Sequence, residues 1–166
     1  MIEINISKTL GRFHLNMEMK SDSRRIGILG ASGCGKSMTL GCIAGIESPD
    51  RGRIVLEGRT LYDREQKINV KPQRRKIGYL FQNYALFPTM SVRKNIMAGL
   101  KCGKAEQEQI ADKMITKFQL DGLGDRLPGE LSGGQQQRAA LARIMAYEPE
   151  VILLDEPFSA LDEFLK

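Results

Sequence analysis

A glycine-rich segment at residues 30–37, with the sequence GASGCGKS, carries residue types that bind phosphate groups. It fits the pattern G-x-x-x-x-G-K-[ST] at every fixed position. The glycines let the backbone curl so that successive N–H groups point at phosphate oxygens, and a helix that begins there adds partial positive charge. Lys36 supplies a mobile cation for the outer phosphates, and the Ser37 hydroxyl is suited to bind Mg²⁺. The segment therefore predicts a site for a nucleoside triphosphate and Mg²⁺, without indicating which reaction follows.

The alternative is a glycine-rich turn that arose by chance. The context favours a phosphate loop, because the apolar run at 25–29 is typical of a strand and residues 36–46 have a helical pattern. Cys34 is interpreted as a small loop residue whose thiol needs no chemistry. The residues predicted to contact the nucleotide here are Gly30, Ala31, Ser32, Gly33, Cys34, Gly35, Lys36, Ser37 and Met38.

Two adjacent carboxylates, Asp155 and Glu156, follow the apolar run at 151–154. The run is typical of a buried parallel strand, and ligands of open α/β sheets lie beyond the carboxyl ends of such strands. Asp155 is therefore predicted to hold Mg²⁺ opposite Ser37, and Glu156 to orient or deprotonate an attacking water. The alternative is a strand that ends in a solvated acidic turn. The phosphate loop in the same chain favours the functional interpretation.

Ser132 precedes two glycines and a helical pattern, which predicts a helix with a serine N-cap and a bare backbone at its first turn. Such a helix start is a second candidate anion site. An ordinary capped helix is the alternative.

Length and composition are those of one globular domain: 166 residues, 42% hydrophobic and 27% charged. No apolar run approaches the roughly 18 residues of a membrane span, and the N-terminus has no signal-peptide pattern. Three cysteines without paired spacing indicate neither a disulfide framework nor a zinc site, which favours a reducing compartment. The basic run at 71–76 is interpreted as a solvated rim, since no aromatic platform for nucleic-acid bases accompanies it.

The periodicities predict a mixed α/β chain. Ile110, Met114 and Phe118 recur every four residues and should share one helical face. The segment 49–52 is expected to be a turn. In chain order the expected elements are strands at 2–6, 13–19 and 25–29, a helix at 36–46, strands at 53–57 and 77–81, a helix at 132–147 and a strand at 151–154.

Residues 131–135, LSGGQ, resemble the signature motif of ABC-type ATPases, and the other motifs stand in that family's order. The resemblance implies an α/β P-loop NTPase core with an antiparallel β subdomain at the N-terminus and a helical subdomain before the signature. It also implies a division into residues 1–87 (β subdomain and phosphate-loop core), 88–143 (helical subdomain) and 144–166 (acidic strand and D-loop at 159–162). The chain looks like the first two-thirds of such a domain, with its last strands missing.

The resemblance assigns further roles. Gln82 would contact Mg²⁺ or the water and act in catalysis with Glu156 and Lys36. Phe13 stands where the family stacks an aromatic ring on adenine, although core packing in its strand is the alternative. In a head-to-tail homodimer, ATP held by one subunit would be contacted in trans by the other subunit's Ser132, Gly133, Gly134 and Gln135.

The opening at 6–13 is similar to that of molybdate and sulfate importer ATPases, and residues 83–99 look like the importer surface that grips a transmembrane permease. The resemblance thus implies ATP-driven solute import, at the cytoplasmic face of the membrane, with a permease, a solute-binding protein and no nucleic acid. The alternatives are a non-transport ABC ATPase of DNA repair or translation, and a nucleotide-binding module without turnover. The family carries a histidine on a later strand, whereas the only histidine of this chain is His14, which precedes the phosphate loop. The resemblance therefore does not extend to hydrolysis by this chain alone.

Overall fold

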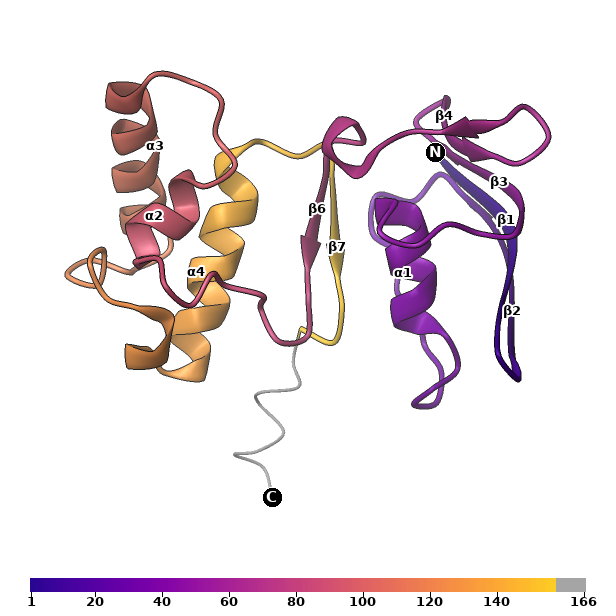
Figure 1. Cartoon of the computed structure of the whole chain (residues 1–166), viewed down its shortest axis with the longest axis horizontal. Coiled ribbons are helices and arrows are strands. Elements are labelled where there is room, and N and C mark those ends of the chain that lie inside the picture. Colours follow the sequence, from indigo (N-terminus) through magenta and orange to yellow (C-terminus); the bar gives the residue numbers. More distant parts are fainter. Residues whose placement is uncertain (158–166) are drawn as a thin grey trace. The chain divides into compact units, whose positions relative to one another are not determined.

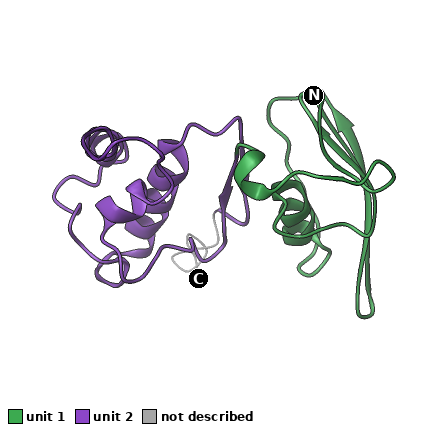
Figure 2. Ribbon diagram, turned by 45° about the horizontal axis from the view of Figure 1, so that its top comes forward, with its two compact units in different colours: residues 1–76 green, residues 77–166 purple. Residues whose placement is uncertain are grey.

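The computed structural model describes residues 1–157, so the expected D-loop at 159–162 lies outside the described residues. The chain divides into two compact units, Met1–Lys76 and Ile77–Lys166 (Figure 2). Each unit is described by itself below. The three-part division at residues 87 and 143 stays a prediction.

Unit 1 is built on a five-stranded antiparallel sheet in the order β2-β1-β3-β4-β5 (Figure 1). The predicted N-terminal hairpin is confirmed: its two strands pair from end to end around a turn at Gly11, whose φ is 58°. Alternation places Ile4, Ile6 and Leu15 in the core. The strands are β1 (Ile2–Leu10), β2 (Phe13–Ser21), β3 (Arg51–Leu56), β4 (Arg59–Asp63) and β5 (Ile68–Asn69).

Helix α1 (Lys36–Ala44) lies alongside this sheet in unit 1 (Figure 1). It begins after Gly35 and ends at Gly45, both with left-handed backbone (φ 98° and 82°). The left-handed Gly45 explains why the helix stops two residues before the predicted end at 46. Cys42 and Ile43 on its last turn are fully buried.

The expected turn at 49–52 is wrong at its second half, because Arg51 and Gly52 belong to β3. Gly52 pairs with Ile6 although its φ is 97°. A Cβ atom on Gly52 would stand 1.9 Å from the carbonyl oxygen of Asn5. The glycine is therefore required by close approach of two strands rather than by a turn.

The expected strand at 25–29 is also wrong: these residues have no regular secondary structure in the described part of the chain. A strand needs a neighbour for its backbone hydrogen bonds, and neither sheet includes this segment. Leu29 is 97% exposed.

Arg75 contradicts the solvated interpretation of the basic run, because it is only 1% exposed. Its guanidinium donates from Nη1 to the carbonyl oxygens of Cys42 (2.8 Å) and Ile43 (2.7 Å) at the end of α1. Nε donates to the Val70 carbonyl at 2.7 Å, and Nη2 to Asn69 Oδ1 at 3.0 Å. A cation on the last carbonyls of a helix also opposes the negative end of the helix dipole. The residue was expected at the surface because charge patterning reports composition and not contacts.

Within residues 77–157, unit 2 combines a two-stranded parallel sheet with three α-helices. Strands β6 (Ile77–Leu80) and β7 (Val151–Leu154) pair in register, as the parallel prediction required. However, β7 is not buried on both faces, since Leu153 is buried while Ile152 and Leu154 are 40% and 45% exposed. Helices α2 (Val92–Met97), α3 (Lys104–Lys117) and α4 (Gly133–Ala146) follow β6 along the chain.

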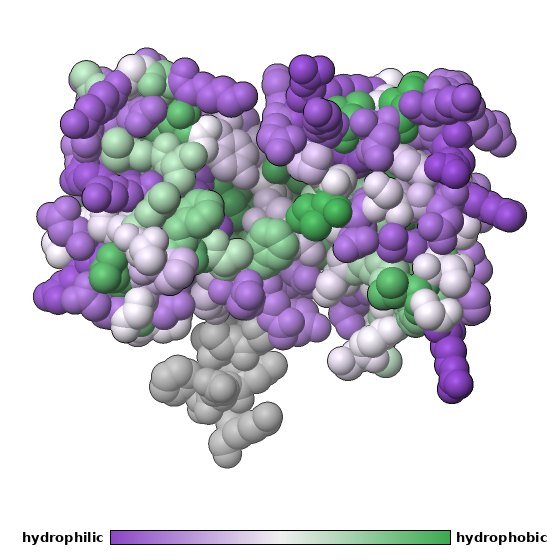
Figure 3. All heavy atoms as spheres, in the orientation of Figure 1, coloured by the Kyte–Doolittle hydropathy of each residue, from purple (hydrophilic) through white to green (hydrophobic). Residues whose placement is uncertain are grey.

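The helices of unit 2 share one apolar core that includes Ile96, Leu120 and Ala139. The predicted face of α3 is confirmed, because Met114 is buried in this core and Ile110 and Phe118 pack against it. Unit 2 also exposes large apolar side chains such as Phe87, and Figure 3 shows hydrophobic residues among hydrophilic ones on the surface. None of the helices within residues 1–157 has the length and hydrophobicity needed to cross a membrane.

We predict that Arg75→Met destabilises unit 1 by about 3 kcal/mol or more, because several buried carbonyls lose their donor at once. The free energy of unfolding from urea titration checks this. The exposed neighbour Arg74 provides the matched control, and Arg74→Met should change stability little. Equal effects of the two substitutions would contradict the role of Arg75.

Candidate functional site

The phosphate loop is shaped by its glycines. Gly33 and Gly35 have φ values of 79° and 98°, a region that favours glycine. A Cβ atom on Gly30 would stand 2.6 Å from the Sγ atom of Cys34, so the loop folds back closely on itself. Glycine is therefore favoured at positions 33 and 35 by backbone conformation and at position 30 by close contact with Cys34.

Lys36 lies across this loop. Its Nζ donates to the carbonyl oxygens of Gly30 (2.8 Å) and Ala31 (2.9 Å). The ammonium group is thus held at the loop where phosphate oxygens are predicted.

The start of α1 fits an anion. The helix has Gly35 as its N-cap, with no side-chain cap and no acidic residue in its first turn. The first N–H groups of a helix have no partner within the helix, and a phosphate satisfies them while its charge matches the helix dipole. The residues present therefore fit the phosphates of a nucleotide.

Phe13 lies beside the same loop. Its Cζ atom is 3.0 Å from the position that a Cβ atom on Gly35 would occupy. The ring is half-buried, so it both packs in the unit and borders the loop. Its contact with adenine stays a prediction.

Gln82 and Glu156 come together in unit 2. The Gln82 Nε2 atom donates to Glu156 Oε2 at 3.0 Å, and both residues are exposed. Glu156 has a left-handed φ of 48°, which is strained for a residue with a side chain. The parallel pairing of β6 and β7 accounts for this meeting, since both strands end at the same edge of the sheet.

Asp155 is 7% exposed at that edge. Its N–H donates to the Leu80 carbonyl at 3.0 Å, and its Oδ2 accepts from the Tyr79 hydroxyl at 3.0 Å. Burial, together with the neighbouring carboxylate of Asp155, raises the pKa of Tyr79 well above its usual range. Tyr79 was not predicted as a site residue, because its contact depends on the pairing of distant strands. A buried carboxylate oriented by a hydroxyl suits a ligand of a hard cation such as Mg²⁺.

The signature segment forms a capping box at the start of α4. The Ser132 Oγ accepts from the Gln135 N–H at 3.3 Å, and the Gln135 Oε1 accepts from the Ser132 N–H at 2.8 Å. This confirms the predicted serine N-cap. Cβ atoms on Gly133 and Gly134 would meet nothing within 4 Å, so the backbone of the first turn is open to a ligand.

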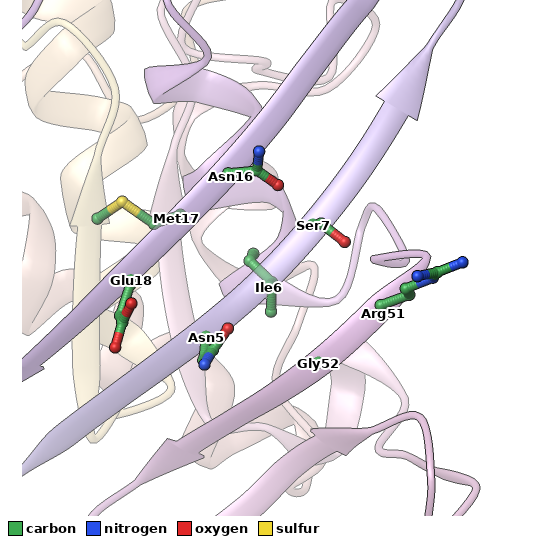
Figure 4. Close-up of a pocket in the computed structure, with 8 residues that line it drawn as sticks. All are labelled: Asn5, Ile6, Ser7, Asn16, Met17, Glu18, Arg51 and Gly52. Atoms are coloured by element: carbon green, nitrogen blue, oxygen red, sulfur yellow. The ribbon is translucent and has the colours of Figure 1, made fainter.

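A separate depression of about 370 Å³ lies on the sheet of unit 1 (Figure 4). It includes none of the predicted site residues. Its lining residues belong to β1, β2 and β3 and are Asn5, Ile6, Ser7, Asn16, Met17, Glu18, Arg51 and Gly52.

The predicted site residues therefore fall into two groups. The phosphate loop and Phe13 belong to unit 1, whereas Gln82, Asp155, Glu156 and the signature segment belong to unit 2. In unit 2 the structure joins Gln82 to Glu156 beside Asp155, whereas the signature segment forms its own capping box.

Comparison with known proteins decides the family. Residues 13–159 match the family model described as "ABC transporter". The chain belongs to the ABC transporter family. The resemblance inferred from the motifs is confirmed, and so is the fold class, because the structural neighbours are ABC cassettes.

Among relatives in the ABC transporter family, the chain is 47% identical over 165 residues to a probable sulfate/thiosulfate import ATP-binding protein CysA of Chlorella vulgaris, covering 95% of this chain and 67% of that protein. It is 42% identical over 163 residues to the molybdenum import ATP-binding protein ModC of Escherichia coli K12, covering 98% and 46%. The chain thus spans less than half of that relative.

A solved member of the ABC transporter family is the ATP-binding cassette MJ0796, whose dimeric structure represents a post-hydrolysis state bound to ADP and Pi. It matches with a TM-score of 0.79 and 26% identity, over 96% of this chain and 75% of that chain.

The two cysteines near the phosphate loop should differ in reactivity. Cys34 is exposed, whereas Cys42 is buried and its burial raises the pKa of its thiol from 9.0 to about 11. At pH 8 this shift alone lowers the thiolate fraction of Cys42 by about 100-fold. We expect iodoacetamide to label Cys34 first, with peptide mapping by mass spectrometry as the measurement. In urea the labelling rates of Cys34 and Cys42 should converge, because both thiols are then exposed. Equal labelling rates in the folded protein would contradict the predicted difference in reactivity.

Proposed function

We propose that this chain binds Mg·ATP and hydrolyses it as the nucleotide-binding part of an ABC import system. The observation that carries the proposal is a phosphate loop with an uncapped helix start in a chain that also pairs Gln82 with Glu156. Membership of the ABC transporter family supports the same activity.

The proposal gives each group a distinct task. Lys36 and the N–H groups at the start of α1 bind the β- and γ-phosphates. Ser37 and Asp155 would hold Mg²⁺, which neutralises charge on the phosphates when bound. Glu156 accepts a proton from the attacking water, and Gln82 orients that water or contacts the metal. Phosphoryl transfer requires mainly such positioning and charge compensation.

A head-to-tail dimer would complete the site. Ser132 and Gln135 are already engaged in their capping box, so the open backbone at Gly133 and Gly134 is the part best suited to contact ATP held by a partner subunit. The dimeric structure of the cassette MJ0796 supports the dimer in this proposal.

The import assignment follows the relatives. Proteins named for the import of sulfate, thiosulfate and molybdenum support a tetrahedral oxyanion as solute. The chain would then act on the cytoplasmic face of a membrane with a permease, and with a solute-binding protein in the wider complex. The exposed Phe87 and Met90 belong to the segment proposed to contact the permease. Reconstitution with candidate permeases, read as oxyanion-dependent ATP hydrolysis, tests this assignment.

Lys36→Ala should weaken Mg·ATP binding by about 10- to 100-fold, because a charge-assisted contact to the outer phosphates is lost. Isothermal titration calorimetry measures the effect. Lys20→Ala is the control, since that lysine lies on β2 with 68% of its side chain exposed. Wild-type affinity in the Lys36 variant would exclude the proposed phosphate contact.

Glu156→Gln should lower the hydrolysis rate by about 10²- to 10⁴-fold while leaving Mg·ATP affinity nearly unchanged, because a proton acceptor is removed and the shape is kept. The same variant should favour an ATP-bound dimer, visible by light scattering. The rate of phosphate release measures the effect. Glu106→Gln is the matched control, since Glu106 is an exposed glutamate on α3. Normal turnover in the Glu156 variant would require a different general base.

A further inference from the structure

The loop after Gln82 has a strained backbone. Tyr84 and Ala85 have φ values of 60° and 43°, and no other adjacent non-glycine residues within 1–157 share this left-handed region. The Ala85 N–H donates to the Asn83 carbonyl at 2.7 Å, which closes a three-residue turn. Side chains disfavour this conformation, so other contacts must maintain it.

Arg143 of α4 supplies such contacts. Its Nη1 donates to the Ala85 carbonyl at 2.7 Å, and its Nη2 donates to the Tyr84 carbonyl at 3.1 Å. Both strained peptide units therefore give their oxygens to one planar guanidinium. The same group lies 5.3 Å from the centroid of the Phe87 ring, a distance typical of a cation–π contact.

Arg143 remains a cation in half-buried surroundings. The residue is half-buried, and burial lowers the pKa of its guanidinium, which still remains charged at any physiological pH. Both hydrogen bonds to the loop are therefore charge-assisted, which makes them stronger than neutral ones. Tyr84 and Leu86 also pack against Leu80, Ala140 and Ile144, so apolar contacts fasten the loop to the same helix.

Helix α4 contacts the chain immediately after both members of the Gln82–Glu156 pair. Arg143 holds the carbonyls two and three residues after Gln82. On the other side, the Gln137 Nε2 donates to the carbonyl of Pro157, the residue after Glu156, at 2.7 Å. The same helix therefore holds the chain on both sides of the hydrogen bond between Gln82 and Glu156.

We propose that Arg143 is a positioning residue for Gln82: it holds the left-handed turn at Tyr84 and Ala85 and thereby ties the Gln82 loop to the helix that begins at the signature segment. The proposal rests on the proposed ATPase function for its catalytic consequence. The restraint of the loop itself is independent of nucleotide. Movement of α4 would move the Gln82 loop with it.

The first test measures amide hydrogen exchange of residues 82–88 without nucleotide, by mass spectrometry. In Arg143→Met, which keeps the apolar stem, exchange in this loop should accelerate about tenfold or more, because two charge-assisted bonds are lost. Arg93→Met is the matched control, since Arg93 bonds Glu108 and Asp112 of α3 in the same unit. It should leave exchange at residues 82–88 unchanged.

The second variant separates positioning from packing. Glycine adopts the left-handed region readily, so Ala85→Gly in the Arg143→Met background should restore at least half of the lost protection. Glycine at position 85 cannot repair a general loss of packing around Arg143. Should Arg143→Met not fold, Arg143→Lys keeps stem and charge without the planar fork and gives the same comparison.

Hydrolysis kinetics provide the catalytic readout. Arg143→Met should lower kcat about tenfold and change KM for ATP less than about twofold, because the phosphate loop is not touched. Adding Ala85→Gly to the Arg143→Met variant should recover part of the lost kcat. Exchange that stays unchanged in folded Arg143→Met, or that rises equally in Arg93→Met, would overturn the proposal. Absence of hydrolysis in the wild-type chain would count against the proposed function alone, since the exchange experiment still tests the restraint.

Discussion

The backbone groups at the two ends of helix α1 are the constraint on which the candidate site depends. At its start, glycine replaces a side-chain cap, so the first N–H groups are suited to a phosphate. At its end, the buried guanidinium of Arg75 binds the carbonyls of Cys42 and Ile43. Helix α1 therefore has its C-terminal carbonyls bound by a side chain and its N-terminal N–H groups suited to a ligand. Because the helix is held in place, it presents a fixed dipole to an anion. Gly45 leaves the space that Arg75 fills, since a Cβ atom there would stand 2.5 Å from Nε.

Helix α4 has the complementary role in unit 2. Its start satisfies its own backbone through the Ser132–Gln135 capping box, which keeps the two glycines of the signature exposed and ordered. Further along, Gln137 and Arg143 reach the segments that follow Glu156 and Gln82. The same helix thus carries a candidate ligand surface and supports a candidate catalytic pair. Left-handed backbone occurs in the segments of that pair, at Glu156 and at Tyr84 and Ala85, and such strain is common at functional sites.

Local patterns were enough to predict much of this. The hairpin at the N-terminus, the helix after the phosphate loop, the capped helix after the signature and the parallel strand before Asp155 all follow from periodicity or from a short motif. The hairpin turn, the helix boundaries and the serine cap depend on residues close in sequence, so their physical cause lies within the predicted segment. The strand before Asp155 also needs its distant partner β6. The family followed in the same way, from motifs in a fixed order.

Contacts between distant segments decided the rest. The run at 25–29 is apolar enough for a strand, but pairing decides whether a strand forms. Arg75 is indistinguishable in sequence from its exposed neighbour Arg74, and only the end of α1 makes it a buried donor. Likewise, Tyr79 meets Asp155, and Arg143 meets the Gln82 loop, across more than fifty residues of chain. The sequence by itself determined which residues can do chemistry, because that is a property of side chains and local backbone. Tertiary structure alone decided which residues hold them in place, because long-range hydrogen bonds and burial leave no local pattern.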